Sequence, residues 1–455
     1  MVFSFIPLGS VKKFLNCNFY IGVFAEPSIT MTPTLCCYSC HSGDDVRYQG
    51  YAMLRLTSLC VFLFSALALA VNSGYSLGAV TLLLASLYLL WKRPRLNMQQ
   101  QDYLVMGTLL VYFFIYTANM LYHADPTREL DIPLRALLAV PVMLLLIAYP
   151  PRAAAWWGGL AVGAIGGAAL ASWQLLMLDM LRPQAATSNA IHYGNVSILL
   201  GMLCLCGLGW ARASSYRLVW ISLLLAGGMA GILGSIISGS RGGWLALLVC
   251  GCVFSFYYSK GRSTYYLAAL MGVLVAVTIS AYVLPDSPVP QRIKVALEDI
   301  KEFKDNDNAT TSIGQRLEMW RTAWALSDEH IWLGMGRSGY LDAKQKLAEE
   351  GKMDASVKDY TNAHNDYLDA LVKRGIIGLA ALLALFLVPL TLFARALRHG
   401  PTSARPFALA GVILCSCYMI FGLTTSSLTL NIGIIMLIFP MVILWALLRQ
   451  QERTA

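Results

Sequence analysis

Apolar runs long enough to cross a lipid bilayer recur along most of this 455-residue chain. A transmembrane helix needs about 20 mostly apolar residues, and runs bounded by charge, proline or glycine mark about twelve candidate spans. They cover residues 56–72, 75–91, 103–122, 133–149, 153–177, 191–210, 218–237, 242–259, 264–284, 375–394, 406–425 and 429–448. Because a bilayer offers no water to backbone N–H and C=O groups, such runs fold as helices. We therefore expect an all-α polytopic membrane bundle of about twelve transmembrane helices.

Charged residues are concentrated in one long segment between these spans. They make up only 13% of the chain, and hydrophobic residues make up 57%, against roughly 25% and about 45–50% in soluble domains. This composition excludes an ordinary cytosolic enzyme. Residues 284–374 hold 13 basic and 16 acidic residues, whereas the rest of the chain holds 21 basic and 9 acidic ones. The basic excess thus belongs to the membrane part, where it sets topology, and does not indicate a nucleic acid partner.

The short loops indicate the orientation of the chain. With a cytoplasmic N-terminus, the inner loops carry eleven basic residues: Lys92, Arg93, Arg95, Arg152, Arg212, Arg217, Lys260, Arg262, Arg395, Arg398 and Arg405. The short outer loops carry four: Arg128, Arg135, Arg182 and Arg241. This split follows the positive-inside rule. We expect both termini in the cytoplasm and the charged segment in the periplasm.

This orientation divides the chain into five parts. Residues 1–52 are an N-terminal extension whose status stays open, since Cys36, Cys37, Cys40 and His41 imitate a zinc cluster without a second ligand pair at finger spacing. The other parts are transmembrane helices 1–9 (53–284), a periplasmic helical loop (285–374), transmembrane helices 10–12 (375–448) and a cytoplasmic tail (449–455).

The periplasmic loop has the pattern of a helical cap between helices 9 and 10. Apolar spacing predicts helices over residues 291–303, 314–326 and 338–350, the last with Ser338 as its N-cap. A further helix, over residues 361–372, is expected to run directly into the tenth span. Such a cap on a membrane bundle suggests the roof of an active site.

Arg241 is costly where it stands, between two apolar spans in the sequence Ser-Arg-Gly-Gly-Trp. An Arg at the edge of the hydrocarbon is usually kept for a partner or a ligand, although it can also extend its side chain to lipid headgroups. Gly242 opens the next predicted helix, and a helix N-terminus beside a guanidinium favours an anion, above all a phosphate.

Two residues of the loop have the chemistry to work with Arg241. Arg316 lies near the start of an amphipathic helix; alone it would be read as a surface charge. His364 precedes the tenth span, and a neutral imidazole with a pKa of about 6.5 is suited to take a proton from a hydroxyl. Asn362, Asn365 or Asp366 would orient its ring.

No credible metal site accompanies these residues. Asp305 and Asp307 form the D-x-D pattern of a site that holds a divalent ion on a nucleotide sugar. They lie in a polar stretch with no preceding strand, so we interpret them as a solvated loop. We expect no metal and no cofactor.

Four motifs occur in order: Ser-Arg-Gly-Gly-Trp at 240–244, Gly-x-Arg-Leu-x-Met-Trp at 314–320, His-x-x-x-Gly-x-Gly-x-x-Gly-Tyr at 330–340 and His-Asn-x-Tyr-Leu at 364–368. Together with the large outer loop between spans nine and ten, they resemble the O-antigen ligase/O-antigen polymerase superfamily of bacterial inner membranes. Residues 189–195 are similar to the ligase branch. Lys373 and Arg374 depart from the pattern, since such proteins often carry an acidic residue there.

The resemblance implies an enzyme of lipopolysaccharide assembly whose active site faces the periplasm. Arg241 and Arg316 would bind the diphosphate of an undecaprenyl-diphosphate-linked glycan donor. His364 would activate a sugar hydroxyl of the lipid A–core acceptor for inverting attack on the anomeric carbon. The expected supporting residues are Asn362, Asn365, Tyr340 and Arg337. The expected partners are these two substrates and the lipids of the bacterial inner membrane.

Two other functions stay open. A polymerase would use the same donor site but a second lipid-linked glycan as acceptor. A polysaccharide transporter would have paired half-repeats and broken helices at the membrane midplane, and the chain instead has one asymmetric loop with its anomalous charges at one face. We therefore favour the ligase.

Overall fold

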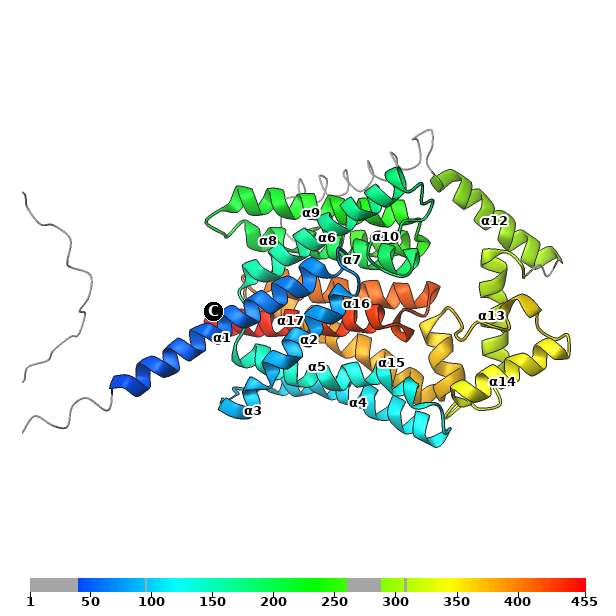
Figure 1. Ribbon diagram of the computed structural model, residues 1–455, viewed down its shortest axis with the longest axis horizontal. Helices are drawn as coiled ribbons and strands as arrows, with labels where there is room; N and C mark the ends of the chain where they lie inside the picture. The colour runs from blue at the N-terminus through cyan, green and yellow to red at the C-terminus, as the bar shows by residue number, and fades with distance from the viewer. Residues whose placement is uncertain (1–39, 95, 260–287, 307–308) are drawn as a thin grey trace, which may run out of the picture. The chain divides into compact units, whose positions relative to one another are not determined.

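The computed structural model describes residues 40–94, 96–259, 288–306 and 309–455, and within these ranges every regular element is helical (Figure 1). The membrane part contains α1 (Cys40–Leu67), α2 (Gly74–Ser86), α3 (Tyr88–Lys92), α4 (Gln100–Tyr122), η1 (Thr127–Leu130), α5 (Asp131–Ala148), α6 (Ala153–Met177), α7 (Ala190–Cys206), α8 (Leu208–Ala211), α9 (Arg217–Ser238), α10 (Arg241–Ser259), α15 (Asp366–His399), α16 (Arg405–Thr424), η3 (Ser427–Thr429) and α17 (Asn431–Thr454). Between α10 and α15 lie α12 (Pro288–Asn306), α13 (Ser312–Ser327), α14 (Gly336–Glu349) and η2 (Ala355–Val357).

The prediction of an all-α polytopic membrane bundle is confirmed. Among the described residues, ten helical segments are long and apolar enough to cross a membrane, and each corresponds to a predicted span. The predicted span 242–259 is α10, whose apolar part, Gly242–Tyr257, is shorter. The predicted span 264–284 lies outside the described residues. Helix α1 begins at Cys40, inside the segment expected to be an extension.

The most buried helices form the centre of the unit Gly50–Ala455. Of the apolar window in α17, 94% is buried, whereas only 28% is buried in the span Gly74–Lys92. Helices that are apolar all round and enclosed by protein form a core, and helices with exposed apolar faces contact lipid. Helix α16 contacts α7, α10, α15 and α17, so it lies among the helices that carry the candidate site.

A glycine break divides α15 into a short and a long helix. Gly375 has φ 63° and ψ −166°, a conformation that other residues rarely adopt. A Cβ atom there would lie 2.2 Å from the carbonyl carbon of Trp332, and one on Gly334 would lie 2.3 Å from that of Lys373. The two glycines therefore let the glycine-rich turn pack directly on α15, where the N–H of Met335 donates to the carbonyl of Val372 over 3.0 Å.

The start of α14 differs from the prediction. The helix begins at Gly336, so Ser338 lies inside its first turn and is not the N-cap. Instead, the Asp125 carboxylate in the α4–η1 connection accepts the N–H groups of Arg337 and Ser338, both over 2.8 Å. A residue distant in the sequence thus takes the role of the capping side chain, and it joins the loop to the membrane bundle.

Candidate functional site

His364 lies in a bend and not on the helix that the sequence predicted. Residues 361–365 are not helical and change the direction of the chain. Helix α15 begins at Asp366 because the Asn365 side chain accepts the N–H groups of Tyr367 and Leu368, at 3.0 and 3.1 Å. His364 has φ 48°, a left-handed conformation that is uncommon for residues other than glycine. Such strain persists only where the surroundings impose it.

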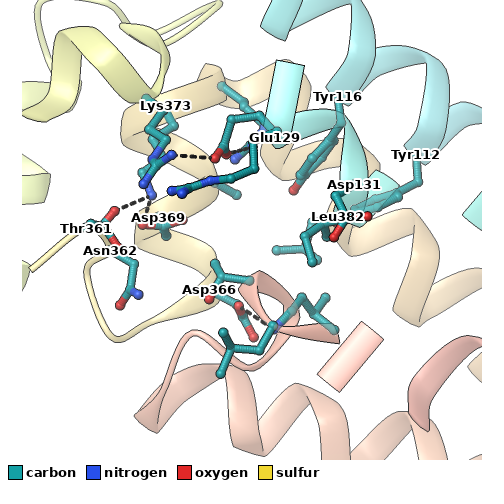
Figure 2. A pocket seen from close by; sticks show the side chains of 18 of the residues that line it. Tyr112, Tyr116, Glu129, Asp131, Thr361, Asn362, Asp366, Asp369, Lys373 and Leu382 are labelled. Carbon is teal, nitrogen blue, oxygen red and sulfur yellow. Dashed lines mark hydrogen bonds and ion pairs between the residues drawn. The ribbon is translucent and has the colours of Figure 1, made fainter. Parts of the chain in front are cut away.

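Two buried charges at the start of α15 hold this bend. Lys373 and Asp369 form an ion pair of 2.7 Å with side chains 6% and 4% exposed. Lys373 Nζ also donates to the carbonyl of Thr361 over 2.9 Å, and Asp369 Oδ1 accepts the N–H of Ala363 over 3.1 Å. Figure 2 shows Lys373 joined to both Asp369 and Thr361. The pair thus fixes the main chain on the N-terminal side of His364.

A second lysine holds the chain that leads into the bend. The buried Lys344 donates from Nζ to the carbonyls of Val357 and Tyr360, over 2.7 and 2.6 Å. Burial, followed by the like charge of Lys373, lowers the pKa of Lys344 to about 8. Lys344 and Lys373 each place their ammonium 5.5 Å from the ring of Tyr340, so the three side chains form one packed group beneath the bend.

The His364 ring is partly buried, and one of its nitrogens is unpaired within the described part of the chain. Its Nδ1 is buried and has no hydrogen-bond partner among the described residues, while the ring meets that of Tyr360 edge-on at 5.5 Å. Burial, and after it the charge of Arg316, lowers the pKa of His364 to about 4. The ring is therefore neutral at neutral pH, and a neutral imidazole can accept a proton.

Arg316, whose charge acts on His364, also lines a small cavity at the start of α10. This cavity has a volume of about 90 Å³. Its lining residues are Arg182, Ile191, Gly239, Ser240, Gly242, Ser312, Arg316 and Thr424. Arg316 lies in the second turn of α13, whose N-cap Thr311 accepts the N–H of Gly314 over 3.0 Å. The lining thus combines the N-terminal region of a helix with two guanidinium groups, two serines and a threonine.

Close packing places the N-terminus of α10 in this cavity. A Cβ atom on Gly242 would lie 2.6 Å from Thr424 Oγ1, and one on Gly243 would lie 2.4 Å from Ser235 Oγ. Ser240 Oγ donates to Asn195 Oδ1 over 2.9 Å. The two glycines therefore let α10 approach its neighbours at distances that a larger residue would prevent. Arg241 is the first residue of α10; its side chain lies outside the described residues.

A larger cavity of about 350 Å³ is lined in part by the bend (Figure 2). Its basic lining residues are Arg128, Arg337, Lys373 and Arg374. Its acidic lining residues are Glu129, Asp131, Asp366 and Asp369. Tyr112 and Tyr116 of α4 form one wall, and Thr361 and Asn362 contribute from the bend itself.

The four predicted supporting residues occupy different positions. Asn362 lines the larger cavity, and its Oδ1 accepts the N–H of His364 over 3.1 Å, so it contacts the main chain and not the ring. Arg337 lines the same cavity and donates to Glu129 over 2.8 Å. Asn365 caps α15 and does not line either cavity, and Tyr340 is fully buried beneath the bend.

Asp366, also expected to orient the ring, is instead used in the α16–α17 connection. Its carboxylate accepts the N–H groups of Ser427 and Leu428, over 3.1 and 3.2 Å. Asp305 lies in the last turn of α12, and Asp307 is outside the described residues. No group of three or more His, Cys, Asp or Glu side chains that could hold a metal is found in the described part of the chain.

Several residues of the site were not singled out from the sequence. In the sequence, Arg182 stands out only as a charge in a short outer loop. It is nevertheless a lone Arg between apolar spans, which is the feature that made Arg241 a candidate. Lys373 stands out in the sequence only as a departure from the family pattern. Nothing in the residues around Lys344 or Asp369 distinguishes them from ordinary surface charges. His192 lies close enough to His364 to be affected by its charge, and it belongs to the segment 189–195 that resembles the ligase branch.

Comparison with known proteins agrees with this part of the chain. Residues 226–383 match the O-antigen ligase family, and this range includes Arg241, Arg316 and His364. An uncharacterised protein of Haemophilus influenzae is 25% identical over 381 residues, which cover 83% of this chain and 94% of that protein. The family match supports the assignment of the chain to the O-antigen ligase superfamily, without separating its ligase branch from its polymerase branch.

Proposed function

We propose that this protein is an O-antigen ligase. It would transfer a glycan from undecaprenyl diphosphate to a sugar hydroxyl of lipid A–core in lipopolysaccharide assembly. The family match supports a glycan transferase of the ligase or polymerase type. The observation that carries the proposal further is the proximity of a neutral histidine to an arginine-lined cavity at a helix N-terminus, because this pairs a base with an anion site.

The smaller cavity suits the donor diphosphate. Within the described part of the chain its lining has two guanidinium groups and no carboxylate, and Arg side chains bind phosphate oxygens through paired N–H donors. The N–H groups at the start of α10 and the hydroxyls of Ser240 and Thr424 add hydrogen-bond donors for the same anion. In this proposal Arg241 joins Arg316 and Arg182 around the diphosphate.

His364 acts as the base in the proposed reaction. The acceptor hydroxyl oxygen attacks the anomeric carbon from the face opposite the diphosphate, so the configuration inverts. The bond between that carbon and the phosphate oxygen breaks, and its electron pair leaves with the diphosphate. The hydroxyl proton moves to a ring nitrogen of His364, a step that contributes about 10²–10⁴-fold in typical enzymes.

Donor binding should also adjust the base. In the free protein Arg316 helps to lower the pKa of His364. A bound diphosphate places negative charge against Arg316 and offsets that effect, since a nearby anion favours the protonated imidazole. The ring therefore becomes more basic when the donor is in place, which is when its proton-accepting role begins.

Fixed guanidinium groups stabilise the charge that develops on the leaving diphosphate, so we propose that transfer needs no metal. The purified protein is expected to transfer glycan at an undiminished rate in EDTA. Loss of activity on chelation that magnesium or manganese restores would contradict this part of the proposal and return attention to Asp305 and Asp307.

The protein is a multi-pass membrane protein by its helices and its family. We propose that it lies in the bacterial inner membrane with the site facing the periplasm. The polymerase differs only in its acceptor. A deletion strain separates the two: for a ligase, lipid A–core stays uncapped while long lipid-linked polymer accumulates. Capping of lipid A–core by single repeat units with loss of long polymer would instead identify a polymerase.

A further inference from the structure

The larger cavity differs in charge from the smaller one. Its four basic and four acidic side chains balance, and several of these are already paired: Arg337 with Glu129 at 2.8 Å and Lys373 with Asp369 at 2.7 Å. The described residues that line the smaller cavity include two arginines and no acidic side chain. A diphosphate therefore favours the smaller cavity, and a ligand of the larger one should carry no strong net charge.

Two tyrosines of α4 also line this polar space. Tyr112 and Tyr116 lie with their ring centroids 4.1 Å apart and are 1% and 6% exposed. Arg374 covers the Tyr116 ring at 4.3 Å from its centroid, so the tyrosines can offer a ligand their hydroxyl groups and not their ring faces. Asn362 and Asn431 contribute amides to the same lining. Phenol hydroxyls, amides and carboxylates all form hydrogen bonds with the hydroxyl groups of a ligand.

The cavity lies next to the proposed base. Its lining includes Thr361 and Asn362, and the Asn362 side chain contacts the main chain of His364 directly. Arg316, in the lining of the other cavity, acts on the same histidine. His364 itself lines neither cavity, but one lining residue of each acts on it: Asn362 through a hydrogen bond and Arg316 through its charge.

We propose that the larger cavity binds the saccharide that accepts the glycan, as a neutral, hydroxyl-rich sugar unit held by hydrogen bonds to the Tyr116 hydroxyl and the Asn431 amide. Its volume of about 350 Å³ lies at the lower end of the range for small-molecule sites. This inference rests on the proposed function, and it adds the acceptor subsite and its chemistry. The sugar comes from lipid A–core in a ligase or from a lipid-linked glycan in a polymerase.

The test uses the full-length protein in nanodiscs and two readouts. Core oligosaccharide released from lipid A is the binding probe, measured by calorimetry. Transfer is measured with lipid A–core and with lipid-linked glycan as alternative acceptors, which identifies the source of the sugar. The variants are Tyr116→Phe and Asn431→Ala. The control is Tyr122→Phe, the same substitution at an exposed position of α4.

Each test variant is expected to raise the Kd of the oligosaccharide and the KM of the acceptor by about 2- to 12-fold, the effect of one hydrogen bond. The donor KM should not change, and Tyr122→Phe should match the unmodified protein. Displacement of the probe by inorganic pyrophosphate, or unchanged Kd in both test variants, would overturn the inference while the ligase proposal stands. Saccharide binding that follows these expectations without transfer to either acceptor would instead refute the proposed function alone.

Discussion

Replacing Lys373 by Met removes the cation that holds the His364 bend. The side chain is 6% exposed, pairs with Asp369 at 2.7 Å and donates to Thr361 at 2.9 Å. Loss of one partner leaves the buried Asp369 carboxylate uncompensated, which typically costs about 3–5 kcal/mol. Asp369 then has only the N–H of Ala363 among these contacts. We expect a loss of stability of that size together with a large fall in kcat.

A double variant separates the two effects. In Lys373→Met/Asp369→Leu both charges of the pair are removed together, so neither is left without its partner, and apolar replacements of a buried pair are often neutral or stabilising. Stability should therefore return toward that of the unmodified protein. The contacts to Thr361 and Ala363 are still missing, so kcat should stay low while donor affinity is kept.

Equilibrium unfolding in mixed detergent micelles measures the stabilities, and transfer assays measure kcat. The control is Lys352→Met, which breaks an ion pair with Glu350 whose lysine side chain is 68% exposed; exposed pairs contribute little, so no measurable loss is expected. If Lys373→Met unfolds like the unmodified protein, or if the double variant recovers kcat along with stability, the bend is not held by this pair.

Three further predictions concern topology, the anion site and pH. In intact cells, Lys346→Cys in α14 should react with a membrane-impermeant thiol reagent; labelling only after permeabilisation would invert the topology. Arg241→Ala and Arg316→Ala should abolish transfer. Replacing either arginine by Lys should impair transfer severely, because the forked geometry of the guanidinium is lost. Near-normal activity of Arg316→Ala would show that Arg316 is only a surface charge. With a pKa of about 4, about 97% of His364 is neutral at pH 5.5, against about 9% for an ordinary histidine. The value of kcat/KM should therefore persist at about pH 5.5. A fall in kcat/KM centred near the ordinary histidine pKa of about 6.5 would contradict the burial of the ring.

The same pKa gives the sign of the effect on stability. The folded-state pKa of His364 lies below its ordinary value of 6.5, so the unfolded chain binds the proton more readily. The contribution of the neutral ring is therefore complete above about pH 6.5 and is lost as the pH falls toward 4.

The sequence was informative where a residue type was costly in its local context. Arg241, between two apolar spans, is such a residue, and its role in anion binding stays a prediction. The apolar runs predicted the spans because their period and length alone determine a transmembrane helix. The helices of the cap followed from their apolar spacing in the same way.

Features that depend on distant partners were not predictable. The helix expected over residues 361–372 begins only at Asp366, because Asn365 caps this later start while Lys373 and Asp369 hold the preceding bend. Ser338 had the right type for an N-cap, but Asp125, more than 200 residues away, takes that role. Lysines such as Lys344 look like surface charges in the sequence and become structural only once the fold buries them.

The central claim is that His364 is the base while the arginines bind the donor. The most direct test is a paired measurement on His364→Ala: donor affinity by direct binding, and ligation by lipopolysaccharide gel. The account predicts that ligation falls by orders of magnitude while donor affinity is largely kept, because the smaller cavity and Arg316 are intact. Loss of donor binding together with ligation would make His364 a diphosphate ligand, and ligation that persists would show that the base lies elsewhere.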